Sequence, residues 1–195
     1  MAVSPHVSPR YEFRIFMPAD ADTDSLVPEG SALEVATSSE SYIVSRLTID
    51  SNVKLRDGAL DVKELKAREG LLELWQPTLV CALPVEARAF TDRAVAGLGL
   101  DLDLPAGAVL DIAAIRQICD AQPSVVVVDV EKRRLHFKIG DALAESSTIS
   151  TGSGMWRTMA VEAEEADAVN QAIEAIGLNT FDNESYPAFL QRIAF

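Results

Sequence analysis

The sequence predicts an α+β protein in which an antiparallel β-barrel or tunnel carries helices packed on its outside. Two observations lead to this prediction. Several segments alternate charged with apolar residues at period two, which is the pattern of strands with one polar and one apolar face. Other stretches have the periodicity of amphipathic helices, which can cover the apolar faces. The charged faces are then left to face one another across a cavity.

The clearest pair of strands is a hairpin around Asp57-Gly58. Asp-Gly is the preferred pair for a two-residue type I′ turn, because both central residues need positive φ. This turn fixes the register of the pair, with Lys54 opposite Asp61 and Val53 opposite Val62. The charged positions of the hairpin therefore share one face, and the apolar positions share the other.

The same alternation recurs at both ends of the chain. Arg10, Glu12 and Arg14 alternate with apolar residues in a predicted first strand. Near the end, Glu162 and Glu164 alternate with Val161 and Ala163. Side chains two residues apart on a strand point to the same side of the sheet. We therefore expect the two arginines and the glutamate of the first strand, and both glutamates of the last strand, to face the interior.

A further strand is predicted from Val125 to Lys138, with basic residues at alternate positions in its second half. Gly140-Asp141 can close a second two-residue turn after this strand. That turn would place Glu145 opposite His136, so a carboxylate would face an imidazole across the strand pair. Such a pair is also an ordinary cross-strand contact, worth about 0.2 to 1 kcal/mol.

The remaining elements follow from turn residues and apolar spacing. Residues 1–9 are expected to form a disordered leader, since Pro5 and Pro9 interrupt regular structure, and residues 10–195 a single domain. A loop or a weak helix is expected over 18–30. The other predictions are strands at 42–48 and 71–79, and helices at 84–97, 108–119 and 166–178.

The formal net charge of -13 argues against non-specific binding to nucleic acid or to an anionic membrane. Basic residues that face inward would instead confine anion binding to a small ligand. Cys81 and Cys119 lack the spacing of metal ligands, and neither a secretory signal nor an apolar run of the ~20 residues needed to span a bilayer is present. We expect a cytoplasmic protein, and its oligomeric state is left open.

Taken in order along the chain, these segments resemble the CYTH domain of the triphosphate tunnel metalloenzymes. The resemblance covers nearly the whole chain, and its weight lies in the ordered set of motifs. It also implies a short helical segment at 30–38. The matching segments are Arg10-Tyr11-Glu12-Phe13-Arg14, Glu40-Ser41-Tyr42, Asn52-Val53-Lys54-Leu55-Arg56-Asp57-Gly58, Lys132-Arg133-Arg134, Gly140-Asp141, Val161-Glu162-Ala163-Glu164 and Asn183-Glu184-Ser185-Tyr186-Pro187.

The first strand departs from the pattern of that family. The family carries Glu-x-Glu-x-Lys there, whereas this chain has Arg10-x-Glu12-x-Arg14. A cation therefore replaces one of the two carboxylates that would hold a metal ion. Either the metal site is rebuilt from other residues or hydrolysis is impaired.

The resemblance implies a small-molecule triphosphate or polyphosphate as ligand and Mg²⁺ or Mn²⁺ as cofactor. Several phosphate oxygens at close range require several cations, and hard divalent ions prefer carboxylate oxygens. Glu162 and Glu164 are the expected catalytic residues, and together with Glu12 they are the expected metal ligands. The expected substrate-binding residues are Arg14, Arg46, Lys54, Arg56, Lys63, Lys132 and Arg134.

Three alternative functions are consistent with these residues. The first is a metal-dependent hydrolase of inorganic or organic triphosphate. The second is a non-catalytic CYTH-like module that binds polyphosphate or nucleotide and has lost its metal site, which Arg10 favours. The third is a scaffold or interaction protein, for which the acidic surface is the only support.

Overall fold

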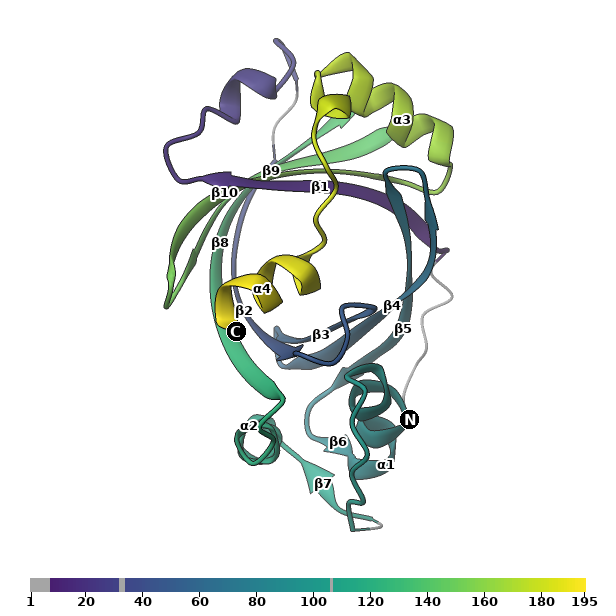
Figure 1. The fold of residues 1–195 in the computed structure, drawn as a ribbon, viewed down its shortest axis with the longest axis vertical. Coiled ribbons are helices and arrows are strands. Elements are labelled where there is room, and N and C mark those ends of the chain that lie inside the picture. Colours follow the sequence, from purple (N-terminus) through teal and green to yellow (C-terminus); the bar gives the residue numbers. More distant parts are fainter. Residues whose placement is uncertain (1–7, 32–33, 106) are drawn as a thin grey trace.

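The structure is a computed structural model that describes residues 8–31, 34–105 and 107–195. Most of the predicted leader lies outside the described residues. Eight strands form a closed antiparallel barrel in the order β1-β10-β9-β8-β2-β3-β4-β5, which confirms the predicted fold class (Figure 1). The strands are β1 (Arg10–Pro18), β2 (Glu34–Ser45), β3 (Ser51–Arg56), β4 (Ala59–Glu69), β5 (Leu72–Ala82), β8 (Val125–Ile139), β9 (Ala142–Thr151) and β10 (Gly154–Ala163).

Both predicted two-residue turns set the register that the sequence indicated. β3 and β4 pair with Lys54 opposite Asp61, and the two residues of the turn between them have positive φ, 51° and 72°. β8 and β9 pair with His136 opposite Glu145. The local turn chemistry therefore decides which side chains of these strands point into the barrel.

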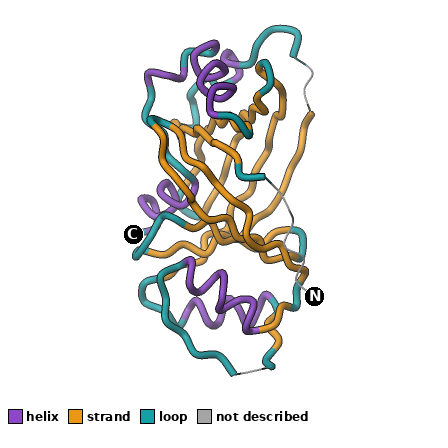
Figure 2. The backbone as a smooth tube through the Cα atoms, turned by 90° about the vertical axis from the view of Figure 1, so that its right-hand side faces the viewer, coloured by secondary structure: helices purple, strands orange, loops and turns teal. Residues whose placement is uncertain are grey.

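Helices cover the barrel on two opposite sides (Figures 1 and 2). α3 (Ala166–Ala175) buries one apolar stripe against the outer faces of β1 and β10. On the other side, α1 (Ala87–Ala89) and the wider π-helical turn η2 (Phe90–Val95) share a hydrophobic cluster with the outer faces of β3 and β4, and α2 (Ile112–Asp120) packs against β8. β6 (Val85–Glu86) and β7 (Val109–Leu110) form a small separate sheet there.

α4 (Tyr186–Ala194) is the exception to the predicted outside arrangement. It lies within the outline of the barrel when the molecule is viewed along the tunnel (Figure 1). Phe189 is completely buried and stacks on the ring of Phe16, with ring centroids 3.8 Å apart. Val44 and Ile149 belong to the same cluster. α4 thus closes one end of the barrel by packing on its inward apolar side chains.

One predicted helix does not form and two begin later than expected, and the strand predicted over 42–48 is the second half of β2, which ends at Ser45. Residues 34–38 belong to β2 and not to a helix, because Glu34 onward pairs with β8. The helix expected from Pro84 begins at Ala87, after the short strand β6. The helix expected from Ala108 begins at Ile112, with Asp111 capping it through the backbone N–H of Ala114 at 2.8 Å. Pairing with other strands overrides the local pattern in the first two cases.

Two short elements complete the described structure. They are the 3₁₀ turns η1 (Asp24–Leu26) and η3 (Leu178–Thr180). Within the described ranges, no helix has the length and apolar character needed to cross a membrane.

Candidate functional site

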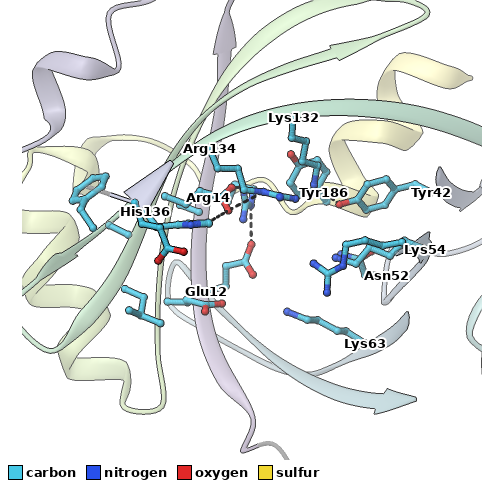
Figure 3. A pocket seen from close by; sticks show the side chains of 18 residues that line it. Glu12, Arg14, Tyr42, Asn52, Lys54, Lys63, Lys132, Arg134, His136 and Tyr186 are labelled. Carbon is cyan, nitrogen blue, oxygen red and sulfur yellow. Dashed lines mark hydrogen bonds and ion pairs between the residues drawn. The ribbon is translucent and has the colours of Figure 1, made fainter. Parts of the chain in front are cut away.

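The barrel encloses a cavity of about 440 Å³ whose wall is formed by inward side chains of the strands and by Tyr186 of α4 (Figure 3). Six lysine and arginine side chains and four glutamates line it. They are Arg14, Lys54, Arg56, Lys63, Lys132 and Arg134, with Glu12, Glu34, Glu145 and Glu162. The cavity therefore has an excess of cations inside a protein whose formal net charge is -13.

The structure brings together most of the predicted site residues. Six of the seven predicted substrate-binding residues line the cavity, as do Glu12 and Glu162. These side chains come from β1, β3, β4, β8 and β10, which are far apart in the sequence. Barrel closure, with β1 paired to both β10 and β5, is what makes them neighbours.

Arg46 and Glu164 are the two predicted residues that do not line the cavity. Arg46 follows the end of β2, is exposed, and places its guanidinium 4.5 Å from the ring centroid of Phe195. Glu164 follows the end of β10 and faces a separate surface hollow beside Asp141 and Glu165. Each lies just beyond the last residue of its strand, so the alternation of faces no longer directs it inward.

Glu40 forms the centre of one charge cluster in the wall. Its side chain is completely buried, and its carboxylate lies 2.9 Å from Nζ of Lys132 and 3.6 Å from Nζ of Lys54. Arg134 donates to the same carboxylate, and Nη1 of Arg56 lies 3.7 Å away. Burial disfavours the charged form, but Lys132 and Lys54 outweigh it and hold the pKa of Glu40 well below its usual range.

Two tyrosines support this cluster from the closed end of the tunnel. Nζ of Lys132 donates to the hydroxyl of Tyr42 over 2.6 Å and lies 3.9 Å from the ring centroid of Tyr186. The tyrosine rings are themselves stacked, with centroids 5.1 Å apart. Cation–π contact with two rings holds Lys132 where it faces the cavity.

Glu145 is the centre of a second cluster, toward the open end. It accepts a hydrogen bond from Arg14 at 3.4 Å, and Arg134 and His136 both lie 3.3 Å from its other oxygen. Burial opposes the charge of Glu145, whereas the hydrogen bond to His136 and the charge of Arg14 lower its pKa strongly. Arg14 also donates to Glu12 over 2.8 Å, so it links two carboxylates.

A row of three carboxylates crosses the open end of the tunnel. Glu12 is the Cα partner of Glu162 on β10 and of Glu73 on β5. Each member has a cationic partner: Arg14 for Glu12, Arg10 for Glu162 at 2.7 Å, and Arg68 for Glu73 at 3.3 Å. In the described ranges, no group of three or more acidic, histidine or cysteine side chains is arranged to hold a metal ion.

These carboxylates do not fit a resident divalent ion in this arrangement, because one oxygen of each is paired with an arginine. The sequence reasoning did not single out Glu40, Tyr42 or Tyr186 as site residues. A signal was present in each case, since Glu40 and Tyr42 lie two residues apart in a segment that matched the family. Tyr186 stands in the Ser-Tyr-Pro segment that matched it too.

Comparison with known proteins shows which solved structures have a similar fold. The sequence matches no protein-family model and no curated protein. Solved structures are similar in fold over nearly the whole chain. One is a Hippeastrum protein named as an adenylyl cyclase and described as having a dominant triphosphatase activity. The two chains are 13% identical, with a TM-score of 0.50, and the match covers 94% of this chain and 95% of the Hippeastrum chain. The chain has the triphosphate tunnel fold of the CYTH proteins.

Two archaeal proteins share this tunnel fold. One from Pyrococcus horikoshii has 12% identity and a TM-score of 0.50, with 93% of this chain and 98% of that chain covered. A conserved protein from Pyrococcus furiosus has 11% identity and a TM-score of 0.51, with 96% and 99% covered. At such identities the likeness concerns the fold, so the function is argued from the residues of the cavity.

Proposed function

We propose that the cavity binds the phosphate chain of an inorganic or organic triphosphate or a short polyphosphate. The observation that carries this proposal is the convergence of six lysine and arginine side chains in one cavity of an acidic protein. Arginine suits bidentate contact with phosphate oxygens, and lysine supplies a compact charge. The acidic exterior disfavours larger polyanions such as nucleic acid.

The shape of the cavity supports a small ligand. Its volume of about 440 Å³ lies in the range of small-molecule sites. α4 closes one end, so a ligand enters past Glu12, Glu162 and Arg10 at the other. An organic group attached to the phosphates would then remain near that open end, while the phosphates reach Lys54 and Lys132.

Hydrolysis is the second candidate function, favoured by the position of Glu12 and Glu162 on neighbouring strands beside the proposed phosphate path. Mg²⁺ or Mn²⁺ would arrive as part of the substrate, already bound to its phosphate oxygens. Glu162 would then be placed to orient a water molecule. Glu164 would take part only if the chain after β10 turned inward.

The competing candidate is binding without catalysis. Arg10 donates to Glu162, which occupies the carboxylate that hydrolysis would need. A cation at this position also repels a divalent ion. This arrangement favours a module that binds triphosphate and leaves it intact.

Calorimetry with tripolyphosphate tests the binding proposal. The titration is made once in the presence of a metal chelator and once in the presence of Mg²⁺ or Mn²⁺. Binding in either condition is expected, together with a higher melting temperature, because a ligand of the native state stabilises it. Release of phosphate from a panel of triphosphates then separates hydrolysis from binding alone. If tripolyphosphate gives neither heat nor thermal shift under any of these conditions, the proposed function is wrong.

A further inference from the structure

Glu40 is a carboxylate built into the wall among the cations that the proposed function assigns to phosphate. Its side chain has no exposed surface, and four of the six cavity cations lie within 4 Å of its oxygens. Tyr42 donates a hydrogen bond to the same carboxylate over 2.7 Å. A buried anion in such surroundings stands where a phosphate group would find its strongest electrostatic partners.

We propose that Glu40 is an internal counter-ion that makes the tunnel select for long phosphate chains over single phosphates. This inference rests on the proposed function and deepens it. A single phosphate that reaches Lys132 or Arg134 meets cations whose charge Glu40 already balances. The electrostatic free energy gained by binding there is therefore small compared with the free-energy cost of dehydrating the anion.

A longer anion reaches cations that Glu40 does not neutralise. Lys63 lines the cavity and has no ion-pair partner within 4 Å among the described residues. Arg14 lines it as well, and its partners are Glu12 and Glu145. A chain of several phosphates can contact Lys63 as well as Lys132, so we expect affinity to rise with chain length.

Other contacts hold the cations in place when the charge of Glu40 is removed. Lys54 and Arg56 lie 3.6 and 3.4 Å from Asp61, which is itself buried. Arg134 also has an ion pair with Glu145 at 3.3 Å, which does not involve Glu40. Replacement of Glu40 by glutamine, which has the same shape, should therefore change the charge of the cluster more than its geometry.

The test compares Glu40→Gln with the matched control Glu131→Gln, which removes one charge from an exposed position on β8. Calorimetry measures the affinity of each protein for tripolyphosphate and for orthophosphate. In Glu40→Gln we expect orthophosphate affinity to rise roughly tenfold or more and the preference for tripolyphosphate to fall. The melting temperature without ligand should drop, and the stabilisation by either anion should increase. The control should match the unaltered protein.

Unchanged or weaker anion binding by folded Glu40→Gln would overturn the inference, since it would show that Glu40 only orients the cations. If that variant does not fold, Glu40→Asp supplies the test, because the shorter carboxylate keeps its charge but withdraws from Lys132 and Arg134. Its orthophosphate affinity should exceed that of the unaltered protein, and an equal or lower affinity would overturn the inference. Failure of all variants and the unaltered protein to bind tripolyphosphate would instead defeat the proposed function.

Discussion

Arg10 donates a hydrogen bond from Nη1 to Oε1 of Glu162 over 2.7 Å, joining β1 to β10 at the open end of the tunnel. Both side chains are about one-third exposed, 36% and 32%. The cation that replaces a carboxylate of the family motif is thus paired directly with a predicted catalytic carboxylate. Arg10 is therefore the residue to replace in a test of metal binding.

Replacement of Arg10 by glutamine should free Glu162 and remove a repulsive charge. We expect Mn²⁺ to bind roughly tenfold more tightly in the presence of tripolyphosphate, because like charges at ~4 Å repel appreciably even at a surface-like dielectric. The free energy of unfolding should change by less than about 1 kcal/mol, since the ion pair is partly exposed. Electron paramagnetic resonance of Mn²⁺ and urea unfolding measure the two effects.

The control for this experiment is Arg133→Gln, which removes the same charge from an exposed position on β8. It should leave Mn²⁺ binding unchanged. Equal Mn²⁺ affinities for Arg10→Gln and the unaltered protein would show that Arg10 does not limit metal binding.

Lys63→Gln should weaken tripolyphosphate binding roughly tenfold, because Lys63 lines the cavity and the described residues offer it no ion pair that competes with a ligand. Its stability should change little. Arg46→Gln is the matched comparison, since Arg46 was predicted from the sequence to bind substrate but lies outside the cavity lining. Calorimetry should show no loss of affinity for Arg46→Gln, and a comparable loss in both variants would contradict the assignment.

His136 should make anion binding depend on pH. The hydrogen bond to Glu145 raises the pKa of His136 above its ordinary value of 6.5. Burial and the charge of Arg134 lower this pKa, and the charge of Glu34 raises it, but the net shift is upward. Protonated His136 adds a cation to the cavity wall at a pH below the raised pKa, and this contribution is lost as the pH rises through it. Tripolyphosphate affinity should therefore fall over that interval.

The comparison of His136→Asn with the unaltered protein at each pH cancels the titration of tripolyphosphate itself. The variant should lack the step that belongs to His136. Identical pH profiles for the two proteins would show that the imidazole does not contribute to anion binding.

Phe189→Ala should lower the free energy of unfolding by about 3 to 5 kcal/mol, the usual cost of removing a buried phenylalanine side chain. Phe189 is completely buried and contacts the rings of Phe16 and Trp156 where α4 closes the tunnel. Phe181→Ala is the control, because Phe181 is 45% exposed. Urea unfolding should separate the two variants, and equal effects would mean that α4 contributes little to the closed end.

The strand pairs closed by short turns could be predicted from the sequence alone. Asp57-Gly58 and Gly140-Asp141 fix register locally, and the period of two then assigns Lys54, Arg56 and Arg134 to inward faces. Both steps depend only on residues close in the chain, which is why they could be predicted. The same alternation also predicted the barrel, because strands with charged inner faces and apolar outer faces can surround a cavity and carry helices on the outside.

The end of each strand, and the side chains found at each depth of the tunnel, depend on how the whole barrel is assembled. Arg46 and Glu164 keep the alternating pattern but lie past the last paired residue, and Glu40 belongs to the part of β2 that pairs with distant β8. α4 packs inside the barrel because the inward side chains at that end are apolar. Period-two alternation gives the face of a side chain, whereas its depth and its neighbours depend on pairing between strands that are remote in the sequence.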